Sequence, residues 1–277
     1  MTTYHSLQGL IAMIRRVHSV PGRRRSGVYS IEGTRLVERA LRAGAPLEAV
    51  LVAEQFARSA DSRHRRLLDE LAAAGCPVSV APDDTLAELT EGRDLGQILG
   101  LVALPPRVRL SDLLSSRPST NNEPHAVARR LFLAAVDIVD PGNVGALTRT
   151  AHAGGAAALL AVGKSDPYHP RATRISRGSI FKLPVVQYDT AGEMIDDLRG
   201  QSAAIVGTAA GGAVPLPRFH WPAQDTAILM GNEAEGLPAA VQAALNHAVT
   251  IPMPDGVDSY SVNAAAAIIL YAARQAI

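Results

Sequence analysis

The second half of the chain alternates short apolar runs with amphipathic segments, and this pattern constrains the fold more than any other feature. From Arg129 onward, the apolar runs predict strands and the segments between them predict helices. Repeated strand–helix alternation favours a mostly parallel sheet covered by helices on both faces, so the fold class is expected to be α/β. The predicted strands are residues 131–139, 157–162, 185–188, 203–208, 227–230 and 248–251, and the predicted helices are residues 145–153, 172–176, 193–199, 239–245 and 261–275.

The first hundred residues show a less regular alternation, which predicts a small α/β module of ordinary domain size. It is expected to begin with a helix over residues 4–20 and a basic break over residues 22–27. Between residues 105 and 125, prolines and polar residues occur without apolar periodicity, which marks a linker. We therefore expect an N-terminal domain of residues 1–107, a linker of residues 108–128 and a C-terminal domain of residues 129–277.

Charge is distributed unevenly, although the net charge of the 277 residues is only +1. Residues 1–66 hold twelve arginines against five acidic residues. A local basic patch is typical of nucleic-acid binding, but arginines on solvated helix faces give the same composition. The single cysteine, Cys76, excludes an intramolecular disulfide and a cysteine-based zinc cluster. The most apolar stretch, residues 264–273, is too short to span a bilayer, so a cytoplasmic protein without a membrane partner is expected.

Polar loops follow three of the predicted strands, at residues 140–149, 231–237 and 251–263. The carboxyl ends of parallel strands lie at one edge of a sheet, and open α/β sheets bind ligands there. The Walker lysine motif is absent, and no Gly-x-Gly-x-x-Gly follows a strand. These absences disfavour a nucleoside triphosphate site and a dinucleotide-dependent oxidoreductase.

The first loop has two readings. Asn143 is either the N-cap of the next helix or a functional group, since asparagine is a favoured cap. Arg149 is either a solvated surface residue or a phosphate ligand at the mouth of the sheet. Arg174 and Arg177 are three residues apart, so on a helix they would share a face.

The other two loops combine flexible backbone with potential ligand groups. Gly231 and Gly236 bracket Glu233, which is expected to orient the loop or a substrate hydroxyl. The proline-rich run at 251–254 would wall a flat ring such as adenine while offering peptide edges. Ser259 or Ser261 would cap the alanine-rich helix that follows.

These loops carry a family resemblance. The segments Asp140-Pro-Gly-Asn-Val-Gly-Ala-Leu-Thr-Arg149, Gly231-Asn-Glu-Ala-Glu-Gly-Leu237 and Ile251-Pro-Met…Ser259 resemble motifs 1, 2 and 3 of the SpoU (TrmH-like) RNA ribose 2′-O-methyltransferases of the SPOUT superfamily. The resemblance covers residues 129–277. The segment from Tyr29 to Val37 is similar to the family's L30e/L7Ae-like substrate-binding domain, a weaker match. Together they resemble the two-domain ribosomal RNA branch, which includes thiostrepton-type resistance enzymes.

The resemblance implies an L30e-like N-terminal domain that binds RNA, and a SPOUT α/β domain with a C-terminal trefoil knot. It also implies a homodimer formed through the knotted domain, S-adenosyl-L-methionine as cofactor, and no metal. The expected substrate is 23S rRNA, with tRNA as the alternative. The cofactor-binding positions implied by the motifs are Thr208, Gly231, Ile251, Pro252, Met253 and Tyr260.

The same resemblance implies the catalytic residues. Arg149 would activate the ribose 2′-hydroxyl together with a substrate phosphate, and it would reach the site from the partner subunit. The reacting groups would be oriented by Asn143, Glu233, Ser259 and Ser261. Methyl transfer of this kind depends mainly on placement of the hydroxyl and on removal of its proton. The residues expected to contact RNA are the arginines Arg23, Arg24, Arg25, Arg35, Arg174 and Arg177.

Motif 3 departs from the family pattern. The family carries Ser-Leu-Asn-Val, whereas this chain reads Ser259-Tyr260-Ser261-Val262-Asn263. Two residues on a helix turn a side chain by about 200°, so Asn263 is not expected to be a simple substitute for the missing asparagine. Either Ser261 supplies a smaller hydrogen-bonding group, or the loop is rearranged. This departure leaves open an RNA-binding homologue that has lost catalysis.

Overall fold

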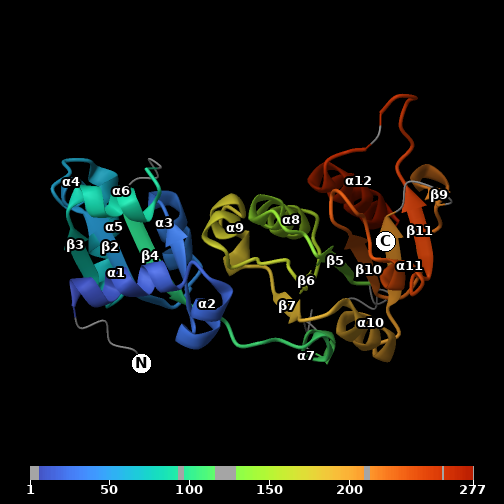
Figure 1. The fold of residues 1–277 in the computed structure, drawn as a ribbon, viewed down its shortest axis with the longest axis horizontal. Coiled ribbons are helices and arrows are strands. Elements are labelled where there is room, and N and C mark those ends of the chain that lie inside the picture. Colours follow the sequence, from blue (N-terminus) through green and yellow to red (C-terminus); the bar gives the residue numbers. More distant parts are fainter. Residues whose placement is uncertain (1–5, 93–96, 116–128, 209–212, 258, 277) are drawn as a thin grey trace, which may run out of the picture. The chain divides into compact units, whose positions relative to one another are not determined.

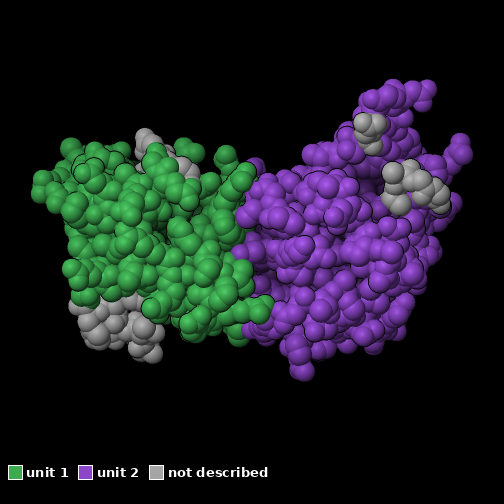
Figure 2. All heavy atoms as spheres, in the orientation of Figure 1, with its two compact units in different colours: residues 1–106, 168–181 green, residues 107–167, 182–277 purple. Residues whose placement is uncertain are grey.

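The computed structural model describes residues 6–92, 97–115, 129–208, 213–257 and 259–276. The chain divides into two compact units, which are coloured separately in Figure 2. The first unit comprises residues 1–106 and 168–181, and the second comprises residues 107–167 and 182–277. Residues 168–181 thus lie in the first unit, although the sequence pattern placed them in the C-terminal domain.

The first unit is built around a mixed sheet in the order β1-β4-β2-β3. Strands β1 and β2 each run antiparallel to β4, and β3 runs parallel to β2. The later segment adds α9, which packs against β1. The elements, most of which are labelled in Figure 1, are α1 (Leu7–Arg16), α2 (Val20–Ser26), β1 (Val28–Glu32), α3 (Thr34–Arg42), β2 (Leu47–Ala53), α4 (Glu54–Ala57), α5 (Ser62–Ala73), β3 (Val78–Ala81), α6 (Asp83–Leu89), β4 (Ile98–Ala103), α9 (Pro170–Ile175) and the 3₁₀ helix η1 (Ser179–Phe181).

The second unit is built around a sheet in the order β7-β6-β5-β10-β8-β11-β9, and every neighbouring pair recorded in it is parallel. The α/β prediction with a parallel sheet is confirmed. The elements are α7 (Leu110–Ser115), β5 (Leu131–Val136), α8 (Pro141–Ala153), β6 (Ala158–Val162), β7 (Val185–Tyr188), α10 (Ala191–Gly200), β8 (Ala204–Thr208), β9 (Val214–Pro215), the 3₁₀ helix η2 (Leu216–Arg218), β10 (Thr226–Met230), α11 (Ala239–Gln242), β11 (His247–Thr250) and α12 (Val262–Gln275).

Helices cover both faces of this sheet, which explains why its strands read as continuous apolar runs. Phe132, Ala134 and Val136 of β5 belong to one buried cluster with residues of α7, α10 and α11. Alternate residues of a strand point to opposite faces. The intervening residues of β5 are also buried, on the face where α8 and α12 contact each other and β5.

Three local predictions differ from the structure. The expected basic break at 22–27 is largely helical, because Ser19 caps α2 by accepting a hydrogen bond from the Gly22 amide. The expected linker contains helix α7, whose Leu110 is fully buried in the core of the second unit. The rest of that linker, residues 116–128, lies outside the described residues. Helix α8 begins at Pro141 rather than at residue 145.

Candidate functional site at the carboxyl edge of the parallel sheet

The three polar loops emerge from one edge of the second sheet, as the sequence predicted. Strand β10 pairs with both β5 and β8, and β8 also pairs with β11. All these pairs are parallel, so the carboxyl ends of the four strands lie side by side. Thr208 ends β8 between the strands that precede Gly231 and Ile251. Its hydroxyl donates to the Leu229 carbonyl of β10 at 3.4 Å.

The start of α8 decides between the two readings of Asn143. Asp140 is the N-cap, and its carboxylate accepts a hydrogen bond from the Gly142 amide at 3.1 Å. Proline at the first helical position suits this start, because its missing N–H has no partner there in any case. Asn143 therefore lies inside the first turn, and its side chain is not used as a cap.

The Asn143 side chain joins the first loop to the other two. Its Nδ2 donates to Oε1 of Glu233 at 2.5 Å, and its Oδ1 accepts from Nδ2 of Asn263 at 3.2 Å. The three residues come from α8, the loop after β10 and the first turn of α12. Three segments far apart in sequence thus meet through one hydrogen-bonded chain of side chains.

Glu233 is held in place by a tightly closed loop. The backbone groups of Asn232 and Gly236 exchange two hydrogen bonds, at 3.0 and 2.8 Å. The Asn232 side chain accepts from the Ala234 amide at 2.9 Å and donates to the Asp137 carbonyl at 3.2 Å. A Cβ atom added to Gly231 would lie 2.3 Å from the Gly236 carbonyl carbon, so only glycine fits beside this turn.

Ser261 has a structural role at this edge. It is the N-cap of α12 and accepts a hydrogen bond from the Ala264 amide at 3.4 Å. The sequence predicted Ser259 or Ser261 as the cap, and the structure places Ser261 in that role, while Asn263 reaches Asn143. The expectation that Asn263 is no simple substitute for the missing asparagine treated both positions as helical, whereas residue 261 is the cap and Asn263 lies in the first turn of α12. Ser259 and Tyr260 are exposed in the loop before the cap.

Arg149 projects from a different side of α8. Six residues separate it from Asn143, which at about 100° per residue places the two side chains roughly 120° apart around the helix axis. Asn143 is half-buried, whereas Arg149 is exposed. Its guanidinium forms no recorded hydrogen bond or ion pair with the residues that the structure describes. The structure therefore does not bring Arg149 into the cluster of Asn143, Glu233 and Asn263.

The residues predicted to bind the cofactor offer peptide groups rather than charges. Residues 251–254 lie outside helix and strand, and Ile251 and Met253 are half-buried there. None of the six predicted positions carries an ionised side chain. Close backbone approach at Gly231, half-buried apolar side chains and irregular peptide edges fit a flat adenine ring held through backbone groups.

The arginines predicted to contact RNA differ in their surroundings. Arg23 is only 3% exposed, and its Nη1 donates to the carbonyls of Val17 and His18 at 2.7 and 3.1 Å. It thus satisfies carbonyls at the end of α1, and this burial corrects its assignment as an RNA contact. Arg24, Arg25 and Arg35 are exposed.

Arg174 and Arg177 do not share a helical face. Helix α9 ends at Ile175, and Arg177 adopts a left-handed backbone with φ of 49°. Nη1 of Arg174 donates to Oε2 of Glu32 at 2.7 Å, within the first unit. The Arg177 carbonyl accepts a hydrogen bond from Arg39, while the Arg177 side chain is exposed.

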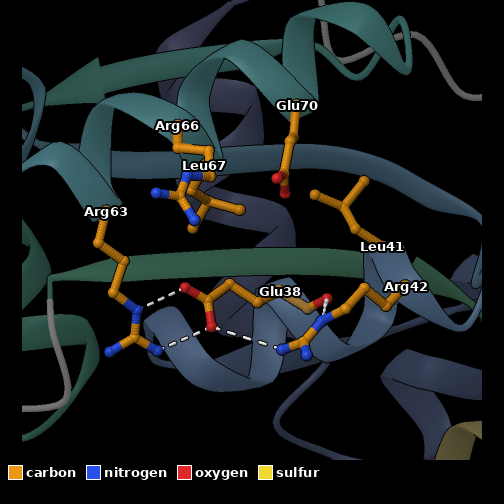
Figure 3. A pocket seen from close by; sticks show the side chains of 7 residues that line it. All are labelled: Glu38, Leu41, Arg42, Arg63, Arg66, Leu67 and Glu70. Carbon is orange, nitrogen blue, oxygen red and sulfur yellow. Dashed lines mark hydrogen bonds and ion pairs between the residues drawn. The ribbon is translucent and has the colours of Figure 1, made fainter.

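An open pocket lies between α3 and α5 of the first unit, and Figure 3 shows the side chains around it. Glu38 is its central charge and pairs with Arg63 on one side and Arg42 on the other. The hydrogen bond from Arg63 holds the pKa of Glu38 below its usual range, aided by the charges of Arg63, Arg42 and Arg35 and opposed by partial burial. The pocket shares no residue with the three loops of the second unit.

The described residues lack two features, a cluster of metal ligands and a membrane-spanning helix. They contain no group of three histidine, cysteine or carboxylate side chains arranged to hold a metal ion. None of the described helices combines the length and the apolar character needed to cross a membrane.

Two family models match the chain. Residues 130–271 match the SpoU rRNA Methylase family model, and residues 10–99 match the MRM3-like substrate binding domain. The chain is 27% identical to the 23S rRNA (guanosine(2553)-2′-O)-methyltransferase RlmP of Bacillus subtilis, over 94% of each chain. It is 32% identical to the 23S rRNA (uridine(2479)-2′-O)-methyltransferase of Streptomyces viridochromogenes, over 92% of this chain and 85% of the relative.

A solved structure shows the same architecture. The SpoU methyltransferase AviRb from Streptomyces viridochromogenes, in complex with AdoMet, superimposes with a TM-score of 0.82 at 27% identity, covering 96% of this chain and 97% of that one. Sequence and structure thus agree over nearly the whole length. The chain belongs to the SpoU rRNA methylase family.

Proposed function

We propose that the protein is an S-adenosyl-L-methionine-dependent RNA ribose 2′-O-methyltransferase that acts on 23S rRNA. The observation that carries this proposal is the hydrogen-bonded cluster of Asn143, Glu233 and Asn263 at the carboxyl edge of the parallel sheet. The relatives RlmP and AviRb support the substrate and the cofactor, because the first is named as a 23S rRNA methyltransferase and the second binds AdoMet.

The chain's residues divide the work of the reaction. When bound, S-adenosylmethionine supplies a methyl group activated by a positively charged sulfur. Thr208, Gly231, Ile251, Pro252, Met253 and Tyr260 would hold it, mainly through peptide groups. Asn143 and Glu233, with Ser259, would fix the ribose in line with that methyl group, and such placement lowers the barrier most in reactions of this type.

Arg149 would activate the 2′-hydroxyl. A guanidinium beside this oxygen and a neighbouring substrate phosphate favours loss of the proton, because it stabilises the developing negative charge. Arg149 faces a different side of α8 from Asn143. We therefore propose that it serves the site of a second subunit in a homodimer formed through the C-terminal unit. A trefoil knot in that unit is proposed from the family resemblance.

An exposed apolar residue supports the dimer. Tyr271 lies on α12, which packs against α8, and 68% of its surface is exposed. A large exposed side chain beside the helix that carries Arg149 suits an interface with a second copy. The first unit, with Arg24, Arg25 and Arg35 exposed, would bind the RNA backbone by charge. A cytoplasmic location stays a prediction.

The proposed function is tested by methyl incorporation. The purified protein is incubated with labelled S-adenosylmethionine and either ribosomal RNA or tRNA, and the position of the methyl group is mapped. Label on a ribose 2′-oxygen of 23S rRNA is expected. Label on tRNA alone would overturn the substrate assignment, and RNA binding without incorporation would show a homologue that has lost catalysis.

A further inference from the structure

Asn263 is a polar residue of the cluster at the sheet edge that the motif resemblance does not explain. It is the second residue of α12, and it donates through Nδ2 to Oδ1 of Asn143 at 3.2 Å. Asn143 in turn donates through Nδ2 to Glu233. Asn143 and Asn263 are 120 residues apart in sequence, and Asn143 and Glu233 are 90 apart.

The direction of these hydrogen bonds follows from chemistry. An ionised carboxylate only accepts, so Glu233 requires the NH₂ group of Asn143. The carbonyl oxygen of Asn143 then faces Asn263 and needs a donor, which only the NH₂ group of Asn263 provides. Reversing either amide would set oxygen against oxygen or NH₂ against NH₂. The orientation of Asn143 is therefore fixed from both sides.

The outer oxygen of Asn263 shows that this arrangement has a cost. Oδ1 of Asn263 is buried and has no hydrogen-bond partner among the described residues. An unsatisfied buried acceptor costs about 1–3 kcal/mol, and such groups call for an explanation in terms of strain or function. A residue that only stabilised the start of α12 would not need this orientation, because Ser261 already caps the helix.

We propose that Asn263 is a positioning residue for methyl transfer: it holds the Asn143 amide so that Asn143 fixes the Glu233 carboxylate. The inference rests on the proposed function. The serine at 261, which stands where the family pattern has asparagine, is occupied as the helix cap, and Asn263 supplies the amide that reaches Asn143 from the first turn of α12. Asn263 acts on the reaction through Asn143 and Glu233.

The test compares Asn263→Ala and Asn263→Asp with the wild-type enzyme. Alanine removes the donor, and we expect kcat to fall about 10- to 100-fold, because a misplacement of about 1 Å costs this much. The KM for RNA and the affinity for S-adenosylmethionine are expected to stay within about twofold of the wild type. Gln275→Ala, an exposed change at the far end of α12, is the control and should leave kcat unchanged.

The Asn263→Asp variant gives a signature that a packing role would not. Once ionised, the introduced carboxylate presents only acceptors to Oδ1 of Asn143, so this variant should be less active than Asn263→Ala near pH 8. When protonated, the introduced carboxyl group regains an O–H donor. Burial and the nearby Glu233 charge are expected to raise the pKa of this introduced carboxyl group above that of a free aspartate. The ratio of Asn263→Asp activity to wild-type activity should therefore rise as the pH falls from about 8 to about 5.5.

A double-mutant cycle then tests the route of action. Asn263→Ala should have no further effect on kcat in an Asn143→Ala background, because both changes break the same chain. Additive effects of the two changes on kcat would overturn the inference. So would losses of activity that are equal in both Asn263 variants, do not depend on pH and parallel a lower melting temperature. Wild-type activity in all Asn263 variants would overturn this inference and leave the proposed function standing. An inactive wild-type protein would overturn the proposed function.

Discussion

Glu32 and Arg174 form an ion pair that ties together two segments of the first unit. Oε2 of Glu32 and Nη1 of Arg174 are 2.7 Å apart, although 142 residues separate them in sequence. The Glu32 side chain is 1% exposed and that of Arg174 is 24% exposed. The pair lies beside α9, whose Thr173 also contacts the Ser30 carbonyl of β1. It anchors residues 168–181 to the first strand of the chain.

Removing Arg174 should therefore destabilise the protein. Arg174→Ala leaves the Glu32 carboxylate buried without this partner, and breaking a buried pair from one side costs about 3–5 kcal/mol. Urea unfolding should show this loss. The double variant Glu32→Gln/Arg174→Met should recover most of the lost stability, because it leaves no buried charge at this position. If Arg174→Ala weakened RNA binding without changing the free energy of unfolding, its role would be RNA contact rather than anchoring.

This ion pair could not be predicted from the sequence, although much of the fold could. The strands and the three loops were predictable, because burial on both faces produces continuous apolar runs and polar residues follow them. Arg174 was predicted to contact RNA, since nothing near it in sequence reveals a buried carboxylate 142 residues away. Arg23 was misassigned for a similar reason: three consecutive arginines look alike until burial separates them.

The candidate site was predicted in composition but not in geometry. Asn143 and Glu233 were identified, yet Asn143 was weighed as a helix cap. The Asp140-Pro141 pair carried the signal that α8 starts earlier, since aspartate is a favoured cap and proline a favoured first residue. Asn263 could not be placed without knowing that α12 begins at Val262, because a small shift at a helix start changes which side chain faces the sheet.

Arg149→Ala should abolish methyl transfer and leave cofactor binding largely intact. Arg149 is exposed on α8, and it is not among the residues proposed to hold S-adenosylmethionine. Incorporation of labelled methyl groups measures the first effect, and calorimetric titration with S-adenosylmethionine measures the second. Methyl transfer at a near wild-type rate would remove Arg149 from the mechanism.

If Arg149 acts across a dimer, activity should be restored in mixed dimers. Arg149→Ala and Glu233→Gln subunits are each expected to be inactive alone. Mixed together, one of the two sites in a heterodimer would combine an intact Glu233 with an intact Arg149 from the partner. Recovery of roughly a quarter of wild-type activity is then expected for random mixing. No recovery after verified subunit exchange would place Arg149 and Glu233 in the same subunit's site.

Gly231→Ala should weaken cofactor binding and have a smaller effect on the stability of the rest of the fold. The added methyl group would lie 2.3 Å from the Gly236 carbonyl carbon and 2.5 Å from the Leu237 nitrogen. Both are backbone atoms, so the loop must shift, and affinity for S-adenosylmethionine is expected to fall at least about tenfold. Gly200→Ala is the matched control, since nothing lies within 4 Å of a Cβ added there. Equal affinities for the two variants would contradict the proposed position of Gly231 at the cofactor.

Arg23 and Arg25 should separate stability from RNA binding. Arg23→Ala removes two hydrogen bonds to carbonyls at the end of α1 and is expected to cost about 2 kcal/mol in urea unfolding. Arg25 is exposed, so Arg25→Ala should change stability by less than about 0.5 kcal/mol. It should instead lower RNA affinity and reduce the salt dependence of binding by about one counterion. The reverse pattern would return Arg23 to the RNA interface.

Glu38 should make stability depend on pH in the acid range. Its pKa is lowered in the folded protein, first by the hydrogen bond from Arg63. A carboxyl group whose pKa is lowered by folding stabilises the protein at pH values above its unfolded-state pKa, about 4.3. This contribution is lost as the pH falls through the folded-state pKa.

Because Arg63 is partly exposed, the contribution of Glu38 is at most about 1 kcal/mol. Glu38→Gln should therefore be less stable than the wild type near pH 7, with the difference shrinking below about pH 4. A difference that stayed constant down to about pH 3 would mean that Glu38 contributes through packing rather than through its charge.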